Sequence, residues 1–336
     1  MKIGVIGAGN WGTALANLLA GKGIDVVLWA YETDVVTNIN NKHKNHLYLQ
    51  GVTLSRDLAA TNNLAEAVRD KDMIVFVAPS HVTRKVAGEV AKGIKKSAIF
   101  VSCTKGIEAS SGKLVSNILQ EAMPDFDKDG FCFLSGPSFA VEVAGRLPTA
   151  VVIASTNPAT ANIAQEAFRT GYFMPFTSDD TIGVQVGGAI KNIVAIACGI
   201  SDGLGFGHNT RAATITRGLY EIIKIGQALG ANPITFAGLA GIGDLVLTCT
   251  SELSRNRQLG FQVGKGRNIE VIQKNMKGVA EGVITAKAVY NLAKKLKLET
   301  PICSEVYKII YEKKSPKKAV SDLTKMEIHE ELKGVV

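Results

Sequence analysis

The sequence predicts an α/β protein, with a doubly wound, mostly parallel sheet in its N-terminal part and an all-α domain after it. In the first half of the chain, short runs rich in Ile and Val alternate with helical patterns, which is typical of a parallel sheet with helices on both faces. The first of these runs leads directly into a glycine-rich loop. After about residue 185, strand-like runs almost vanish and helical patterns take over.

The strands expected in the first half are short apolar runs of the kind that a parallel sheet buries on both faces. Helices are expected between them, where apolar residues recur with helical spacing and Gly, Asn or Pro marks an end. We expect strands at 2–6, 25–29, 73–77, 98–102, 131–134, 150–154 and 173–176, and helices at 13–20, from Asn62 or Asn63 to about Arg69, after the loop that begins at Pro79, at 113–121 and at 158–169.

A chain of 336 residues exceeds what one compact core usually holds, so two domains are expected. Helical patterns in the second half lie at 188–200, 210–229, 233–239, 256–263, 283–296 and 304–311. We therefore divide the chain into an α/β domain at residues 1–187 and an all-helical domain at residues 188–336.

The composition excludes several classes of partner. The net charge of +8 suits nucleic acid, an anionic membrane surface or acidic small molecules, but the lysine runs lack interleaved aromatic residues and no nucleic-acid motif is present. No uninterrupted apolar stretch reaches the ~20 residues of a membrane helix. The five cysteines lie in apolar settings without CxxC or metal-binding spacing. We expect no nucleic acid, no membrane insertion, no metal, reduced thiols and a cytoplasmic location.

The glycine-rich loop at residues 7–12 has the spacing of a dinucleotide-binding fingerprint. Gly7, Gly9 and Gly12 form G-x-G-x-x-G, with Asn10 and Trp11 between them, directly after the first expected strand and at the start of a helix. Gly7 suits a tight turn, Gly9 lets the backbone approach a pyrophosphate, and Gly12 allows close packing of helix and strand. The uncapped helix N-terminus favours the diphosphate. The loop predicts a Rossmann-type domain for NAD or NADP.

Tyr31 and Glu32 stand about 20 residues after the glycines, where such domains discriminate between the two cofactors. An acidic side chain there accepts hydrogen bonds from a free ribose 2′-hydroxyl and repels a 2′-phosphate. Glu32 therefore favours NAD over NADP, unless its side chain simply points to solvent.

Lys191 is the one charged residue in a long helical stretch of apolar and small residues. A buried lysine is unfavourable without a purpose, and one whose pKa is lowered towards neutral can act as a general acid or base. The alternative is that its ammonium group extends to the surface. Asn192 beside it could bond substrate hydroxyls.

Polar residues follow several of the expected elements. Lys105 comes after the strand at 98–102, and Gly136 and Ser138 come after the strand at 131–134, so both segments lie at the edge where parallel sheets bind ligands. The segment 254–257 reads Ser-Arg-Asn-Arg at an expected helix start, which suits a phosphate group, although Arg255 and Arg257 could each be surface charges.

These segments together resemble the NAD(P)-dependent sn-glycerol-3-phosphate dehydrogenases of bacteria. The resemblance runs along nearly the whole chain. It is carried by GAGNWGTALA (7–16), CTKGIE (103–108), SGPSFA (135–140), GAIKNIVAIACGISDGLGFG (188–207), GLAGIGDLVLTCTSELSRNRQLG (238–260) and EGVITA (281–286).

The resemblance implies reduction of dihydroxyacetone phosphate to sn-glycerol 3-phosphate, in the supply of glycerophospholipids, by a protein that forms a homodimer. It implies that Lys191 is the catalytic acid and base. The implied substrate site comprises Lys105, Gly136, Ser138, Lys191, Asn192, Asp244, Ser254, Arg255 and Asn256. The implied cofactor site comprises Gly7, Gly9, Asn10, Trp11, Gly12, Tyr31, Glu32, Lys105, Ala140, Arg255, Val279 and Glu281.

Two other functions fit parts of the sequence. A related enzyme of the same two-domain plan could reduce another small acid or ketone, although the segment 254–257 favours a phosphorylated substrate. A dinucleotide-sensing regulator would keep the glycine-rich loop without needing a buried lysine at position 191.

Overall fold

The computed structural model describes residues 1–276, 280–327 and 330–331, which divide into two compact units. The first unit comprises Met1–Thr104 and Val115–Thr181, and the second comprises Lys105–Leu114 and the chain from Ile182 onward. The sequence placed the boundary after residue 187. In the structure the units divide where the long helix α8 begins, and the excursion at Lys105–Leu114 joins the second unit because Ile107 and Leu114 are buried in its core.

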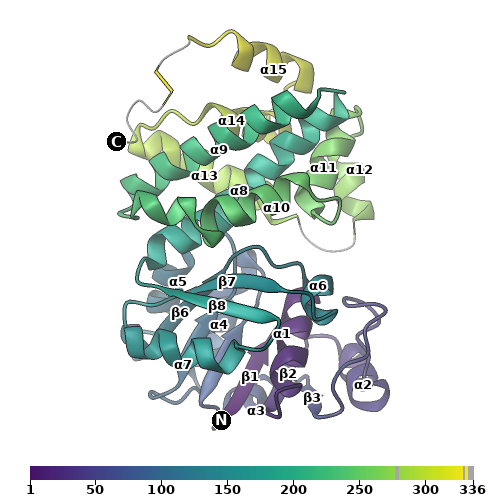
Figure 1. Ribbon diagram of the computed structural model, residues 1–336, viewed down its shortest axis with the longest axis vertical. Helices are drawn as coiled ribbons and strands as arrows, with labels where there is room; N and C mark the ends of the chain where they lie inside the picture. Colours follow the sequence, from purple (N-terminus) through teal and green to yellow (C-terminus); the bar gives the residue numbers. More distant parts are fainter. Residues whose placement is uncertain (277–279, 328–329, 332–336) are drawn as a thin grey trace. The chain divides into compact units, whose positions relative to one another are not determined.

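The first unit is built on one eight-stranded sheet with the strand order β3-β2-β1-β4-β5-β6-β7-β8. Figure 1 shows the sheet with β7 and β8 side by side. Strands β1 to β6 run parallel, β7 pairs antiparallel with β6, and β8 pairs parallel with β7. The strands are β1 (Lys2–Ile6), β2 (Asp25–Trp29), β3 (Leu58–Thr61), β4 (Met73–Phe76), β5 (Ile99–Ser102), β6 (Phe131–Ser135), β7 (Thr149–Ala154) and β8 (Phe173–Ser178).

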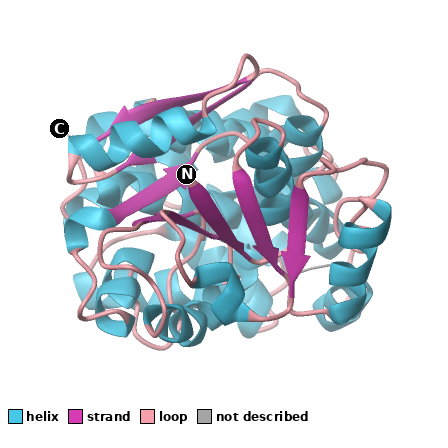
Figure 2. Ribbon diagram, turned by 90° about the horizontal axis from the view of Figure 1, so that it is seen from below, coloured by secondary structure: helices cyan, strands magenta, loops and turns pink. Residues whose placement is uncertain are grey.

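Helices cover both faces of this sheet (Figure 2). They are α1 (Asn10–Ala20), α2 (Thr33–Lys42), α3 (Leu64–Val68), α4 (Thr83–Ala91), α5 (Val115–Ala122), α6 (Ala140–Ala144) and α7 (Pro158–Phe168). Every residue of β4, β5 and β6 is buried, as expected for central strands covered on both sides. The predicted α/β class and the mostly parallel sheet are confirmed.

Most expected elements of the first unit are confirmed, and those at 2–6 and 25–29 match to the residue. The strand β3 and the helices α2 and α6 were not predicted. The sequence of α2, TDVVTNINNK, is rich in Asn and β-branched residues, which favour helices weakly. The sequence of β3, LAAT, is short and lacks the Val, Ile and aromatic residues typical of strands.

The described part of the second unit is helical, which confirms the predicted all-α part. Its elements are α8 (Thr181–Gly203), α9 (His208–Ala228), η3 (Pro233–Ala237), η4 (Leu239–Gly243), α10 (Asp244–Thr250), α11 (Arg255–Gly264), α12 (Ile269–Asn275), α13 (Glu281–Leu296), α14 (Pro301–Tyr311) and α15 (Pro316–Thr324). The helices α10, α12 and α15 were not predicted; each is short, at seven to nine residues.

Helix α8 forms the centre of the second unit. Nineteen of its 23 residues are buried. It is long and apolar enough to cross a membrane by length and composition, but 89% of its most apolar stretch is buried within the fold. A helix that is apolar on all sides is also the expected core helix of a folded domain.

Candidate active site

The loop between β1 and α1 in the first unit has the geometry that its glycines predict. Gly7 adopts φ +115°, and a Cβ there would lie 2.9 Å from the Val77 carbonyl oxygen. A Cβ at Gly12 would lie 1.8 Å from the Gly7 carbonyl oxygen, whereas a Cβ at Gly9 would meet nothing within 4 Å. No side chain caps the N-terminus of α1. The loop is closely packed at Gly7 and Gly12 and open at Gly9, so its residues fit a dinucleotide diphosphate.

The side chains that flank this loop differ in exposure. Asn10 is exposed at the first position of α1, while Trp11 and Ala140 are both half-buried against the core of the first unit. Ala140 is the first residue of α6. Asn10, Trp11 and Ala140 therefore all lie at or next to a helix N-terminus in this unit.

Glu32 is held by a hydrogen bond that the sequence did not reveal. The Tyr48 hydroxyl donates to the Glu32 carboxylate at 2.6 Å, and Glu32 is half-buried at the N-cap position of α2. This hydrogen bond, together with burial, raises the pKa of Tyr48 to about 12. Tyr31 is 83% exposed. The alternative in which Glu32 points freely into solvent is therefore wrong.

Gly136 and Ser138 follow β6, as predicted. Gly136 adopts φ +128°, and a Cβ there would lie 3.0 Å from the Val151 Cα, so only glycine fits this turn without strain. The Ser138 hydroxyl donates to the Gly136 carbonyl at 3.0 Å. The two predicted residues form one compact turn at the carboxyl end of β6.

Lys191 lies in the core of the second unit beside Asp244. Its side chain is 8% exposed and that of Asp244 is 1% exposed, so the alternative of a surface ammonium group is wrong. Lys191 Nζ donates to Asp244 Oδ1 and, at 2.8 Å, to Thr248 Oγ1. Lys105 Nζ donates to the other carboxylate oxygen, Oδ2, at 2.7 Å. Two ammonium groups therefore share one buried carboxylate.

The charges in this cluster shift the pKa values of its members. Burial, with a smaller contribution from the Lys105 ammonium, lowers the pKa of Lys191 to about 8, although Asp244 opposes the shift. Burial alone would raise the pKa of Asp244, but the two ammonium groups outweigh it and hold that pKa below its usual value. The cluster thus contains an ionised carboxylate and a lysine that can exchange a proton near neutral pH.

Glycines allow the backbone to bring Lys191 and Asp244 together. A Cβ at Gly187 of α8 would lie 2.3 Å from the Ala240 carbonyl oxygen, and one at Gly241 would lie 2.1 Å from the Phe236 carbonyl oxygen. The absence of a Cβ at Gly187 lets η4 pack directly on α8, one helical turn before Lys191, and its absence at Gly241 lets η4 fold back against η3. Asp244 then begins α10.

Asn192 and Asn256 are joined by a hydrogen bond between two helices. Asn256 Nδ2 donates to Asn192 Oδ1 at 2.9 Å, and Asn256 Oδ1 accepts from the Gly282 backbone N–H at 3.0 Å. Gly282 follows Glu281, the first residue of α13, which is half-buried. Two predicted residues, Asn192 and Asn256, thus lie on a single chain of contacts that links α8, α11 and α13, and Glu281 is the neighbour of its last member. Val279 lies outside the described residues.

The segment 254–257 divides into side chains with different roles. Ser254 is buried and caps α11 by accepting from the Arg257 backbone N–H at 3.2 Å. Arg255 is exposed. The Arg257 guanidinium donates through Nε and Nη2 to Asp202 Oδ2 at 3.0 and 2.7 Å. Of the two arginines considered for a phosphate, the structure leaves Arg255 on the surface and pairs Arg257 with a carboxylate.

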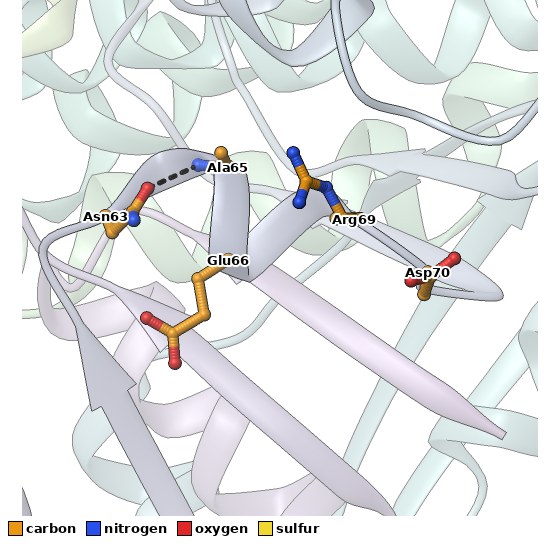
Figure 3. Close-up of a pocket in the computed structure, with 5 residues that line it drawn as sticks. All are labelled: Asn63, Ala65, Glu66, Arg69 and Asp70. Carbon is orange, nitrogen blue, oxygen red and sulfur yellow. Dashed lines mark hydrogen bonds between the residues drawn. The ribbon is translucent and has the colours of Figure 1, made fainter.

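Two further observations concern other candidate sites. A surface cavity of about 350 Å³ beside α3 is lined by Asn63, Ala65, Glu66, Arg69 and Asp70, and Figure 3 shows the Asn63 side chain turned back to cap α3. Its lining contains none of the predicted site residues. Within residues 1–276, 280–327 and 330–331, no group of three or more His, Cys, Asp or Glu could hold a metal ion.

Sequence reasoning missed Thr248 and Tyr48. Thr248 lies four residues after Asp244 on the same helix, so its spacing could have indicated that the two side chains share a face. Tyr48 follows the unpredicted helix α2, and nothing near it in sequence indicated its contact with Glu32.

Comparison with known proteins agrees with this arrangement. Residues 2–161 match the family described as NAD-dependent glycerol-3-phosphate dehydrogenase N-terminus, and residues 180–321 match the corresponding C-terminus. A glycerol-3-phosphate dehydrogenase [NAD(P)+] of Citrifermentans bemidjiense is 53% identical over 322 residues, which are 96% of each chain.

Solved structures give the same result. The crystal structure of glycerol-3-phosphate dehydrogenase from Coxiella burnetii superposes with a TM-score of 0.92 at 38% identity, covering 97% of this chain and 99% of that one. A Plasmodium falciparum glycerol-3-phosphate dehydrogenase has a TM-score of 0.88 at 26% identity, covering 98% and 97%. This chain belongs to the NAD-dependent glycerol-3-phosphate dehydrogenase family.

Proposed function

We propose that this protein catalyses the reversible reduction of dihydroxyacetone phosphate to sn-glycerol 3-phosphate with NADH or NADPH. The observation that carries the proposal is the buried cluster of Lys191, Asp244, Thr248 and Lys105. The substrate follows from the reaction named for relatives that are about half identical to this chain over nearly its whole length.

Lys191 is the general acid of the reduction. The reduced nicotinamide supplies the hydride, so negative charge develops on the ketone oxygen, and the Lys191 ammonium gives a proton to that oxygen. In the reverse direction the neutral amine takes the proton from the hydroxyl. Burial lowers the pKa of Lys191 to about 8, which suits both directions near neutral pH. Asp244 stays ionised and orients Lys191.

Arg255 and the start of α11 hold the substrate phosphate in this proposal. The Arg255 guanidinium is exposed, and helix N-termini favour anions. Asn192, Asn256 and Ser254 line the same region, and Asn192 Nδ2 makes only a long contact, 3.5 Å, with the Gly188 carbonyl, so it can donate to a substrate hydroxyl. Lys105 is the second cation beside the reacting oxygen. Gly136 and Ser138, in the turn after β6, are further proposed substrate ligands.

We propose that the cofactor is held by the loop Gly7–Gly12 with its residues Asn10 and Trp11, and by Tyr31, Glu32, Ala140, Lys105, Arg255 and Glu281. Within this set Glu32 favours NAD over NADP, because the Tyr48 hydroxyl holds its carboxylate in one place at the end of β2. A fixed carboxylate accepts from the ribose 2′-hydroxyl and repels a 2′-phosphate.

The assembly and setting of the enzyme are inferences from the same family. We propose a homodimer, a cytoplasmic location and a role in supplying glycerophospholipid synthesis. The five free, buried cysteines support a reducing compartment.

An absorbance assay of dihydroxyacetone phosphate reduction, run in parallel with NADH and NADPH, tests the proposed reaction. We expect turnover with either cofactor and a higher kcat/KM with NADH. A protein that binds NADH but reduces no phosphorylated ketone would be the dinucleotide-sensing regulator. A protein that prefers an unphosphorylated acid or ketone would be the related enzyme of the same two-domain plan.

A further inference from the structure

Ion pairs around one buried carboxylate join three helices of the second unit, next to the segment 254–257 that contains the proposed phosphate ligands. Asp202, in the last turn of α8, has a side chain that is 5% exposed. Its Oδ2 accepts from Arg257 Nε and Nη2, and its Oδ1 accepts from Arg211 Nε and Nη2 at 3.0 and 2.7 Å. Arg211 belongs to α9, and Arg257 is the third residue of α11. One carboxylate therefore ties both helices to the end of α8.

The contact between α8 and α11 consists largely of backbone. Cβ atoms at Gly199 and Gly203 of α8 would lie 2.1 and 2.3 Å from the Arg257 and Phe261 carbonyl oxygens. Cβ atoms at Gly260 and Gly264 of α11 would lie 2.1 and 2.4 Å from the Ile196 and Ile200 carbonyl oxygens. Four glycines present no interlocking side chains at this contact, so the polar contacts beside it help to set how far α11 slides or turns along α8.

Two polar contacts set this register. The ion pair of Arg257 with Asp202 holds the first turn of α11 at one end of the glycine contact. The hydrogen bond of Asn256 to Asn192 holds the same turn beside Lys191. Asn256 also accepts from the backbone at the start of α13, so a shift of this turn would disturb three helices at once.

We propose that Arg257 is a positioning residue and not a phosphate ligand. Its ion pair with Asp202 fixes the first turn of α11 so that Arg255, Ser254 and Asn256 stand in the arrangement that receives the substrate phosphate. This inference rests on the proposed function, because it concerns the phosphate end of that substrate.

The test compares three variants: Arg257→Ala, Asp202→Asn and Arg211→Ala. Arg211→Ala is the matched control, because it removes one guanidinium from the same carboxylate but leaves α11 tied to α8. For each variant we would measure kcat and KM with dihydroxyacetone phosphate and with dihydroxyacetone, which lacks the phosphate. The ratio of the two kcat/KM values reports on the phosphate site and is insensitive to a general loss of folded enzyme.

Arg257→Ala is expected to lower this ratio at least tenfold, mainly through a higher KM for dihydroxyacetone phosphate, while Arg211→Ala stays within threefold of the wild type. Asp202→Asn is expected to lower the ratio as Arg257→Ala does. If Arg257 were itself a phosphate ligand, freeing it from Asp202 would leave the ratio unchanged or raise it, and that result would overturn the inference.

Two further outcomes are distinguishable. If Arg257→Ala does not fold, Arg257→Lys takes its place, because lysine keeps the charge but not the paired N–H donors. We expect Arg257→Lys to lower the ratio of the two kcat/KM values by a smaller factor. An unchanged ratio in both Arg257→Lys and Asp202→Asn would overturn the inference. If all variants had the wild-type ratio of the two kcat/KM values, and the wild type reduced dihydroxyacetone phosphate normally, the inference about Arg257 would be overturned while the proposed function would stand. A wild-type protein that does not reduce dihydroxyacetone phosphate would overturn the proposed function and this inference with it.

Discussion

Lys191 and Lys105 bond the same carboxylate, yet their surroundings differ. Lys191 has an 8% exposed side chain, and that of Lys105 is 21% exposed. The less exposed lysine has a pKa lowered to about 8, because desolvation disfavours its charged form. Asp244 counteracts this shift, so the carboxylate keeps the ammonium available as an acid near neutral pH.

Asp244→Asn tests this balance. The neutral amide removes the charge that raises the pKa of Lys191, so that pKa falls further below its ordinary value. Reduction requires the protonated lysine, so kcat/KM for reduction should fall above about pH 8 in the wild type and from a lower pH in the variant. Rate profiles between pH 5 and 10 check this prediction, and an unchanged descending limb would contradict it.

We also expect the loss of the ion pair in Asp244→Asn to destabilise the fold by about 3 kcal/mol.

A substitution of Glu32 tests which cofactor the proposed dinucleotide site prefers. Glu32→Ala removes the carboxylate that Tyr48 holds, so the repulsion of a 2′-phosphate is lost and kcat/KM with NADPH should rise relative to NADH by about tenfold, or about 1.4 kcal/mol. Asp34→Ala is the matched control, because Asp34 is an exposed acid in the first turn of the same helix. An equal change of cofactor ratio in the two variants would show that overall charge, and not Glu32, sets the preference.

Helix packing depends on glycine at the contact between α8 and α11. Gly260→Ala would place a Cβ 2.1 Å from the Ile196 carbonyl oxygen, so the helices must separate, and we expect a loss of about 2 kcal/mol of unfolding free energy. Gly88→Ala is the control, because a Cβ at this position of α4 would meet nothing within 4 Å. It should stabilise the protein by about 0.5 kcal/mol, since alanine favours helices over glycine. Denaturant titration measures both; equal effects would contradict the close contact.

A second link between helices joins α9 to α14. The buried Glu221 carboxylate accepts from the Ile302 and Cys303 backbone N–H groups at 2.6 and 3.0 Å, which caps α14 from a neighbouring helix. Burial raises the pKa of Glu221 to about 7, although these N–H groups oppose the shift. A carboxyl group with a raised folded pKa favours the folded state at low pH, and this contribution is lost as pH rises from about 4.5 to about 7.

Glu221→Gln should remove this pH dependence. Relative to the variant, the wild type should lose on the order of 3 kcal/mol of unfolding free energy between pH 4.5 and 7. Denaturant unfolding of both proteins at several pH values in this window gives the difference directly. A difference that stays constant with pH would mean that Glu221 titrates at its ordinary value in the folded protein.

At the scale of the whole molecule, the sequence predicted what depends on local pattern. The strand, glycine loop and helix at residues 2–20 are contiguous, and Lys191 stands out because its own helix is otherwise apolar. The contacts that it did not predict join distant positions. Tyr48 and Glu32 are 16 residues apart, Asp202 and Arg257 are 55 apart, and Asn192 and Asn256 are 64 apart. Such pairs depend on how separate segments of the chain pack together, which local spacing does not encode.

The two units supply different parts of the proposed chemistry. The first carries the glycine loop and Glu32, and the second carries the lysine cluster. A change at Lys191 should therefore affect proton transfer without removing the binding of the dinucleotide.

Steady-state reduction of dihydroxyacetone phosphate by Lys191→Ala, with cofactor binding measured on the same protein, tests the central claim most directly. We predict that kcat falls by about 10² to 10⁴-fold, the range that general acid catalysis contributes. NADH should still raise the melting temperature of the variant as it does that of the wild type, because the glycine loop is intact. Near-normal turnover in Lys191→Ala would contradict the account, since the proton would then come from another group.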